Sequence, residues 1–360
     1  MKAEYTTYIV VLFIISLFSA GNYYVFSRFS IWLSIGLGWK FNLFGALLGF
    51  CSFILILFHF YYFKFVYSIA SCWFGIMFIA FNVCIIGDIV ARILPINQIY
   101  IAYCAISIVF FLSVYSVVNN LSDRKVESIQ LQSPKIETPA RIVLIADTHI
   151  SGYSDPKYLQ CLVREINSQN PDIVTIVGDF ADGKTDYASI EPINDIKTPV
   201  YLVMGNHEIW NNHDGAIEKK LSKTKISIAH KKKFSSKGVQ IIGVNFADGQ
   251  HTLKEGLDDI EIDTGQYNVL LYHEPKEVKI AQKTGFDLML SGHTHGGQIF
   301  PWNHVTKLFY KYIKGLYEYE GMKIYVSQGT GVWGPPMRLG SENEITVIDL
   351  MPDQVHKKRQ

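Results

Sequence analysis

Residues 141–149 read RIVLIADTH, and this short stretch sets the pattern on which the fold of the chain depends. An aliphatic run ends directly in polar residues, which is typical of a buried strand that delivers side chains to the edge of a sheet. The same plan recurs in DIVTIVGD at 172–179 and in PVYLVMGNH at 199–207. Amphipathic stretches near 156–168 and 189–196 separate these runs, so the sequence predicts consecutive βα units.

Further strand-like runs follow, mostly separated by loops or single helices. They read VQIIGVNF at 239–246, YNVLLYHE at 267–274, FDLMLSG at 286–292, KIYVSQG at 323–329 and ITVIDL at 345–350. Because helices are sparse in this half, we expect a second sheet beside the first. The predicted fold class is α/β (α+β) with two sheets.

The first third of the chain has a different composition from the rest. The 360 residues are 49% hydrophobic and 18% charged, which excludes a disordered chain, yet residues 1–122 contain only seven Lys, Arg, Asp or Glu. Four apolar runs, at about 8–26, 42–63, 66–94 and 98–118, reach the roughly 20 residues that cross a bilayer. They show no polar face at helical spacing, so we predict a four-helix transmembrane domain whose first helix is a retained anchor.

Basic residues beside the predicted helices indicate an orientation in the membrane. With four spans, both ends of the helical domain lie on one side, where the basic residues outnumber those on the other: Lys2, Lys64, Arg124 and Lys125 against Arg28, Lys40 and Arg92. The positive-inside rule then predicts a multi-pass protein of the cell membrane with its second domain in the cytoplasm. Four of the five cysteines lie in the spans, so no disulfide framework is expected beyond them.

Two ionisable residues fall inside the predicted spans, His59 and Asp88. Asp88 precedes Arg92 by four residues, which predicts an ion pair within one helix; a transport or ligand-binding role is the alternative. The expected domains are the transmembrane domain at 1–122, a linker or leading strand at 123–138, the second domain at 139–352 and a mobile tail at 353–360.

Nearly every predicted strand of the second domain ends in residues that bind metal ions. They are Asp147, His149, Asp179, Asn206, His207, His273, His293 and His295. Strand ends are where ligand sites form in α/β sheets, and a set of carboxylate, amide and imidazole donors without thiolate suits Mn, Fe or Zn. These residues outnumber the four ligands of one tetrahedral ion, so we predict two divalent ions that share a bridging carboxylate.

The motifs DTH, GDFADG, GNHE, HEP and GHTHGGQ occur in this order between about Arg141 and Leu350. In this respect the sequence resembles the calcineurin-like metallophosphoesterases. GHTHGGQ together with GTGVWGPPMRLGSENEITVIDL is similar to a bacterial membrane-associated branch often called YkuE-like, which includes enzymes that hydrolyse the pyrophosphate of UDP-diacylglucosamine. The resemblance implies a sandwich of two mixed sheets flanked by helices, with a dimetal site at their joint edge.

The resemblance also implies a role for each motif residue. It implies that one ion is bound by Asp147, His149 and His295, that the other is bound by Asn206, His273 and His293, and that Asp179 bridges the two. His207 is implied to face the substrate as the catalytic residue. Asp182 is a candidate for support of the ligands, and Glu208 for that role or for substrate binding, with solvated carboxylates as the alternative.

The implied reaction is hydrolysis of a phosphoester or pyrophosphate by a hydroxide that bridges the two cations, for which Mn is the favoured metal. No serine or cysteine motif suggests a covalent nucleophile; Cys161 lies on the apolar side of a predicted helix. Two alternatives to a lipid-linked substrate remain open. One is an anchored phosphodiesterase or phosphatase for soluble nucleotides or phosphoproteins, and the other is a non-catalytic sensor of phosphate ligands.

Three features outside the motifs bear on the substrate and partners. Residues 301–319 have the pattern of an interfacial helix, or of a core helix with a basic outer face. Arg338, in a glycine- and proline-rich segment, is a candidate for binding a substrate phosphate. Eight lysines between 219 and 237 form a solvated surface or a contact with anionic lipid. They lack interleaved aromatic residues, so no nucleic-acid partner is expected.

Overall fold

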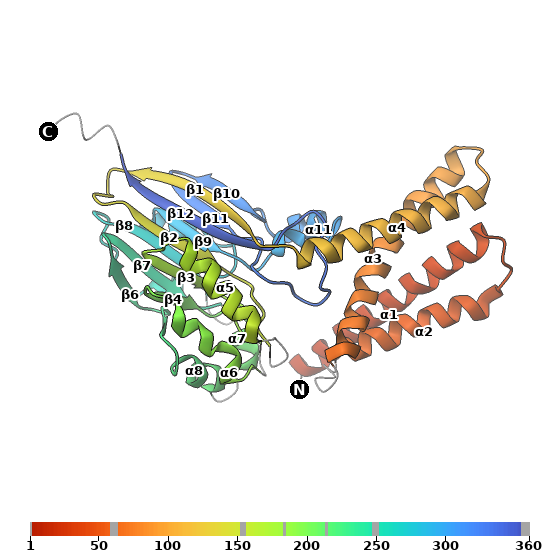
Figure 1. Cartoon of the computed structure of the whole chain (residues 1–360), viewed down its shortest axis with the longest axis horizontal. Helices are drawn as coiled ribbons and strands as arrows, with labels where there is room; N and C mark the ends of the chain where they lie inside the picture. Colours follow the sequence, from red (N-terminus) through yellow and green to blue (C-terminus); the bar gives the residue numbers. More distant parts are fainter. Residues whose placement is uncertain are drawn as a thin grey trace. The chain divides into compact units, whose positions relative to one another are not determined.

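The structure, a computed structural model, describes residues 2–57, 64–151, 156–182, 185–212, 215–246 and 252–353. By its internal contacts the chain divides into two compact units. The first contains residues 1–122 with two short later segments, 299–301 and 334–339, and the second contains most of the chain from Asp123 onward. Each unit is described by itself (Figure 1).

The first unit consists of four long helices: α1 (Lys2–Trp32), α2 (Gly38–Leu57), α3 (Lys64–Ile93) and α4 (Gln98–Leu121). All four are long and apolar enough to cross a membrane, and the mean hydropathy of their apolar segments lies between 1.7 and 2.3. Much of their apolar surface points outward, because isoleucine, leucine and phenylalanine side chains dominate the exposed residues of this unit. This is the burial expected of helices whose solvent is lipid.

Asp88 pairs with a different helix from the one that the sequence predicts. Its carboxylate accepts a 2.8 Å hydrogen bond from the hydroxyl of Tyr24 and lies 3.5 Å from the guanidinium of Arg28, both on α1. The prediction of an ion pair with Arg92 is therefore wrong, because α1 and α3 pack together and present a nearer cation. His59 lies outside the described residues.

The second unit contains two six-stranded sheets. The strands of sheet 1 lie in the order β1-β12-β2-β3-β4-β5. Their bounds are β1 (Lys125–Ser133), β12 (Glu344–Pro352), β2 (Ala140–Ile145), β3 (Ile173–Val177), β4 (Val200–Val203) and β5 (Ile226–Ile228). From β2 to β5 all neighbours are parallel, so the carboxyl ends of β2, β3 and β4 reach the same edge.

Sheet 2 has the strand order β10-β11-β9-β8-β7-β6. Its strands are β10 (Gly315–Tyr319), β11 (Met322–Val326), β9 (Leu288–Ser291), β8 (Tyr267–Tyr272), β7 (Val239–Val244) and β6 (Lys233–Ser236). Strands β7, β8, β9 and β11 are parallel, while β10 and β6 are antiparallel edges. Both sheets are therefore mixed.

Alternate side chains of each strand enter different cores, which shows how the sheets are layered. In β2, Ile142 and Leu144 pack with residues of sheet 2, whereas Val143 and Ile145 pack against α5. In β8, Val269 and Leu271 join the shared core, while Leu270 packs toward α9 and α10. Strands buried on both faces account for the uninterrupted aliphatic runs of the sequence. The architecture is the predicted sandwich of two sheets covered by helices.

The helices of the second unit are short and surround the sheets. They are α5 (Pro156–Ser168), α6 (Tyr187–Ile190), α7 (Asn206–Asn211), α8 (Ala216–Leu221), α9 (Leu253–Leu257), α10 (Val278–Thr284) and α11 (Trp302–Phe309). Helices α5 to α8 are the green elements beside β3 and β4 in Figure 1. The helical pattern of residues 301–319 is confirmed only over α11, because Gly315–Tyr319 pairs with β11 as strand β10.

Residues 123–138 are chiefly a strand rather than a linker. Strand β1 runs parallel to β12 from the pair Lys125–Glu344 to the pair Ser133–Pro352.

The basic stretch 219–237 is spread over α8, β5 and β6, and several of its lysines bind inside the unit: Lys220 to Thr185, Lys225 to Ile196, Lys233 to Glu261 and Lys237 to Asp172. These contacts favour a solvated protein surface. Of the predicted tail, residues 354–360 lie outside the described ranges.

The layered core predicts that alanine substitutions at two positions of sheet 1 lower the stability of the domain by very different amounts. Ile142 is fully buried between the sheets, whereas Val126 on β1 is 41% exposed. We expect Ile142→Ala to lower the free energy of unfolding by about 2–5 kcal/mol through the cavity it leaves, and Val126→Ala to change it by less than about 0.5 kcal/mol. Pulse proteolysis of the detergent-solubilised chain across a denaturant series measures both. Equal effects would contradict the layering.

Candidate metal centre

The ends of five parallel strands supply the candidate ligands. Asp147 follows β2, Asp179 follows β3 and Asn206 opens α7 directly after β4. In sheet 2, His273 follows β8 and His293 follows β9, with His295 in a short 3₁₀ turn. Backbone hydrogen bonds tie the first two loops together, since the amide of Asp147 donates to Gly178 and that of His149 donates to Asp179, at 3.0 and 2.9 Å.

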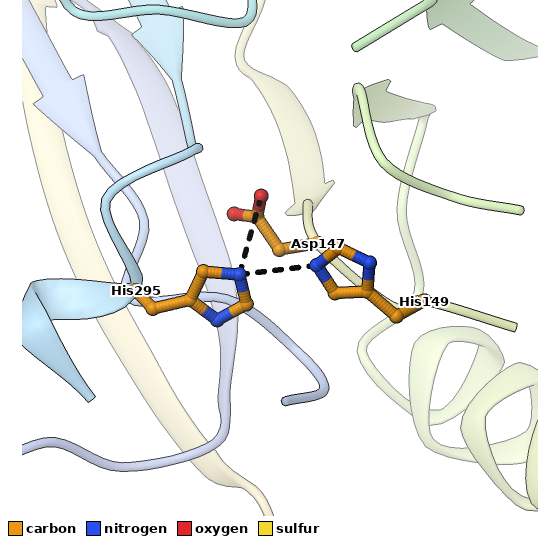
Figure 2. A group of neighbouring side chains, drawn as sticks. All are labelled: Asp147, His149 and His295. Atoms are coloured by element: carbon orange, nitrogen blue, oxygen red, sulfur yellow. Dashed lines mark hydrogen bonds and ion pairs between the residues drawn. The ribbon is translucent and has the colours of Figure 1, made fainter. Parts of the chain in front are cut away.

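Asp147, His149 and His295 form one group of neighbouring donors, shown in Figure 2. The Nε2 atoms of the two imidazoles are 3.1 Å apart, and Nε2 of His295 lies 3.8 Å from Oδ1 of Asp147. All three residues are buried. Figure 2 shows the two rings turned toward each other from separate loops, with the carboxylate above the space between them.

Asp179, His273 and His293 form a second group. Nε2 of His273 lies 3.4 Å from the Asp179 carboxylate and 3.2 Å from Nδ1 of His293. The amide oxygen of Asn206 completes this group, at 3.2 Å from His273 Nε2 and 2.9 Å from His293 Nδ1. The structure thus brings together all seven residues that the sequence nominates as ligands.

A third group joins the other two and includes His207. Its members are His149, Asp179 and His207, so His149 and Asp179 are each shared between two groups. The carboxylate of Asp182 lies 2.9 Å from Nδ1 of His207 and 3.2 Å from Nδ1 of His149. Asp182 therefore orients both rings, and it leaves the Nε2 atom of each ring on the side of Asp179.

The hydrogen-bond partners of two rings fix where their lone pairs point. Nδ1 of His273 donates to the carbonyl of Val177 at 2.7 Å, so Nε2 faces the group. Nε2 of His293 lies 2.7 Å from the Tyr310 hydroxyl, which itself donates to Glu274 at 2.8 Å. His293 is then the donor to Tyr310, and its Nδ1 lone pair faces Asn206 and His273.

The electrostatics of the cluster require positive charge at its centre. Burial raises the pKa of Asp147 to about 6. Although burial opposes the charged imidazolium, the Asp182 carboxylate and its neighbours raise the pKa of His149 to about 9, and Asp179 raises that of His273 to about 10. Burial, with the charge of His273, lowers the pKa of His293 to about 3. Carboxylates packed among imidazoles away from water thus require cations or protons between them.

Divalent metal ions fit this donor set. In neutral His273 and His293 the facing nitrogens carry lone pairs, and they meet the Asn206 amide oxygen and the Asp179 carboxylate within 3.4 Å or less. Lone pairs that converge in this way repel one another unless a cation lies among them. Nitrogen and oxygen donors without sulfur are the ligands of Mn, Fe and Zn sites, and two linked groups offer donors for two ions.

The backbone of the cluster is strained. Five of the candidate ligands have a left-handed backbone: Asp147, His149, Asp179, His293 and His295, with φ between 48° and 71°. Such conformations cost about 1–3 kcal/mol each in residues other than glycine and are concentrated at functional sites. Gly205 permits the loop after β4 to approach Asp179 closely, because a Cβ atom there would lie 2.2 Å from Oδ1 of Asp179.

Glu208 has the supporting role that the sequence gives as one alternative, and not the role of a substrate contact. The side chain is fully buried, and its two oxygens accept hydrogen bonds from the backbone amides of Asp179, Ala181 and Gly205 at 2.8–2.9 Å. Burial, with the nearby charge of Asp179, raises its pKa to about 7. We therefore correct that assignment: Glu208 holds the loop of Asp179 against the start of α7.

Arg338 is also withdrawn as a substrate ligand. It belongs to the first unit, where its amide donates to the carbonyl of Ser116 and its carbonyl accepts from the side chain of Asn119. Its side chain is fully buried. A guanidinium enclosed in this way has no open face for a phosphate, and the sequence pattern of glycines and prolines carried no information on burial.

The structure adds residues that the sequence analysis missed. Tyr310 and Glu274 orient His293, and burial raises the pKa of Tyr310, so its hydroxyl remains a donor.

The side-chain amide of Gln298 bonds both the backbone amide and the backbone carbonyl of Trp333, at 3.1 and 2.9 Å. The Trp333 ring then lies 6.1 Å from that of His207, as does Trp210. Glu274, Gln298 and Trp333 stand within quoted motifs and Tyr310 lies within the stretch 301–319, but nothing in the sequence indicates which group each of them contacts.

The strain at His149 predicts a difference between two variants that both remove its imidazole. His149→Gly relieves the left-handed backbone, whose cost is about 1–2 kcal/mol, whereas His149→Ala retains it. Glycine also makes the unfolded chain more flexible, which lowers the free energy of unfolding by roughly 0.4–1 kcal/mol. The glycine variant is therefore expected to be more stable than the alanine variant by about 1 kcal/mol. Thermal unfolding in chelator measures this difference.

Metal titration in the same experiment provides the control. We expect added Mn²⁺ to raise the melting temperature of the wild-type chain and to raise that of both variants much less, because a ligand is lost. If alanine equals glycine in chelator, strain is not stored at this position.

Comparisons with known proteins agree with this geometry. Residues 140–297 match the model of the calcineurin-like phosphoesterases. The chain is 32% identical over 250 residues to a metallophosphoesterase of Campylobacter jejuni subsp. jejuni, across 66% of each protein. It is 29% identical over 275 residues to a transmembrane protein with metallophosphoesterase domain of Bos taurus, across 68% of this chain and 61% of that one.

Among solved structures, a protein of Thermus thermophilus aligns with a TM-score of 0.38 and 14% identity, over 54% of this chain and 92% of that one. The matched regions span slightly less than two thirds of the length of the curated relatives described above. From the match to the family and to these relatives, we conclude that this chain carries a calcineurin-like metallophosphoesterase domain.

Proposed function

We propose that the protein is a membrane-anchored phosphohydrolase that uses two divalent metal ions to cleave a phosphoester or pyrophosphate bond, on a lipid-linked substrate. The observation that carries this proposal is the convergence of donors in linked groups, with Asp179 common to two of them. We propose Asp147, His149 and His295 as ligands of one ion, Asn206, His273 and His293 as ligands of the other, and Asp179 as the bridge. Mn is the proposed metal.

When bound, the two cations supply the positive charge that a phosphorus-centred anion requires and activate the attacking water. His207 is the proposed catalytic residue: within the group that it forms with His149 and Asp179, its side chain is 18% exposed whereas theirs are 4% exposed. Asp182 holds a proton on Nδ1 of His207, so Nε2 is the atom that meets the substrate. As an imidazolium, which also carries a proton on Nε2, His207 donates a hydrogen bond or a proton from that atom to the leaving oxygen.

The surroundings of His207 support a substrate with a large apolar or aromatic part. Trp210 and Trp333 are each 59% exposed and lie within 6.1 Å of the His207 ring, and Phe246 packs against both Trp210 and His293. Exposed tryptophans beside a catalytic group stabilise bound apolar or aromatic groups. The four membrane-length helices of the same chain favour substrates that reside in the bilayer.

The proposal predicts different losses in three variants. Asp179→Ala and His293→Ala should lose metal and activity together, because each removes a donor of the second group. His207→Ala should retain metal and lose turnover by about 10²–10⁴-fold, the range for a lost proton donor. The measurements are metal content by mass spectrometry and Mn-dependent hydrolysis of bis(4-nitrophenyl) phosphate by the full chain in detergent.

A control and a substrate comparison complete this test. Lys197→Ala alters an exposed side chain before β4, at the end of that strand opposite Asn206, and should leave both readouts unchanged. Loss of metal in His207→Ala would instead make His207 a ligand. A wild-type chain that turns over neither this diester nor a lipid pyrophosphate with Mn bound would contradict a phosphohydrolase. Faster cleavage of a soluble cyclic nucleotide than of the lipid pyrophosphate would contradict the proposed substrate class, but not the phosphohydrolase activity.

Trp333 tests the proposed substrate class separately from the chemistry. We expect Trp333→Ala to raise KM for a lipid-linked pyrophosphate by roughly 2- to 10-fold, the equivalent of the 0.5–1.5 kcal/mol of an aromatic contact, while kcat stays near wild type. The conservative change Trp333→Phe should restore most of the affinity. An equal effect on the small diester would assign Trp333 to the structure of the site rather than to substrate binding.

A further inference from the structure

Helix α11 (Trp302–Phe309) is amphipathic with its apolar side turned outward. At about 100° per residue, Leu308, Val305, Phe309 and Trp302 share one arc of roughly 120°. Leu308 is 80% exposed, Phe309 71% and Trp302 51%. Within this fully described helix the buried side chain is Thr306, a polar one. A helix of a water-soluble protein normally buries its apolar arc instead.

Contacts at the carboxyl end of α11 hold the helix in this orientation. Tyr310 directly follows Phe309, and its hydroxyl bonds both Glu274 and the ring of His293. The ammonium of Lys276 lies 4.7 Å from the centre of the Tyr310 ring. Shortly afterwards Tyr312 and Ile313 are buried in the domain. The chain is therefore anchored on the side opposite the apolar arc, so α11 cannot rotate this arc inward without loss of these contacts.

We propose that the outward arc of α11, formed by Trp302, Val305, Leu308 and Phe309, inserts into the surface of an anionic lipid bilayer. This interaction surface is distinct from the four long helices and is additional to them. The proposal rests on the proposed membrane attachment of the chain, and it is independent of the phosphohydrolase chemistry. These four residues form the α11 lipid surface.

Charge and residue type favour a bilayer as the occupant. Lys307 in α11 and Lys311 just after it are exposed, and each lysine close to an anionic membrane contributes about 1 kcal/mol of attraction. Trp302 is of the residue type enriched at the boundary between headgroups and acyl chains. The same chain carries four helices long enough to span a membrane, so a bilayer is available to the domain at all times.

The position of α11 in the chain gives this contact a consequence at the metal centre. Phe309 belongs to the α11 lipid surface, and the next residue, Tyr310, bonds the candidate ligand His293. Insertion of α11 would therefore position the metal-binding loops close to the headgroup region, where the phosphates of lipid-linked substrates reside. A soluble substrate would gain nothing from this arrangement.

The test measures the depth of α11 in a bilayer with the full chain. Leu308→Cys carries a bimane label in a background in which the five native cysteines are replaced, and the chain is reconstituted in nanodiscs of phosphatidylcholine with or without phosphatidylglycerol. Lys197→Cys, an exposed position before β4, is the matched control. Nitroxide lipids are the quenchers. We expect several-fold stronger quenching at position 308 than at 197, and a further increase with phosphatidylglycerol.

Two further measurements separate the possible failures. The double change Lys307→Gln and Lys311→Gln should remove the dependence on phosphatidylglycerol while some quenching remains. Equal, weak quenching at 308 and 197 would overturn the proposal. A blue-shifted bimane emission without quenching would also overturn it, and would assign the surface to the chain's own helices or to a second copy. Extraction of the chain by alkaline carbonate would instead refute the membrane attachment.

Discussion

The second unit depends on one electrostatic constraint: two aspartates and several imidazoles are packed together where water is largely excluded. Asp147 and His273 are fully buried, and Asp179 keeps only 3% of its surface. Such a group is stable only if positive charge lies within it, whether from protons or from metal ions. Two sheets whose parallel strands end at one edge allow this packing, because each strand delivers one or two polar residues from an otherwise apolar core.

Much of the surrounding structure serves to hold these residues against their mutual repulsion. Glu208 accepts three backbone hydrogen bonds and fixes the loop of Asp179, while Asp182 orients two imidazoles at once. The left-handed backbone at five candidate ligands is the accompanying cost, which the buried cores on both faces of the sheets offset. A site held so firmly is preorganised, so binding of ions requires little movement of the chain.

The features outside the ligands indicate how chemistry and membrane are related. His207 is more exposed than His149, and its ring lies 6.1 Å from each of two exposed tryptophans, one of them held by Gln298. On another side of the cluster, Tyr310 joins His293 to α11, a helix with its apolar arc turned outward. The proposed recognition of a bulky organic group and the proposed contact with lipid are thus connected to the same candidate metal centre by one or two residues.

The sequence by itself determined most of the elements and which residues are candidate ligands. Strand periodicity and apolar run length are local properties, so the βα units, the four long helices and the polar strand ends, Asp147 to His295, could be predicted. Tertiary structure decided which groups meet: Asp88 pairs with Arg28 rather than Arg92, Arg338 and Glu208 are buried, and Tyr310 reaches His293. Residues 315–319 became a strand because β11 offered them a partner. Burial and pairing depend on neighbours distant in the chain, and local sequence carries no record of them.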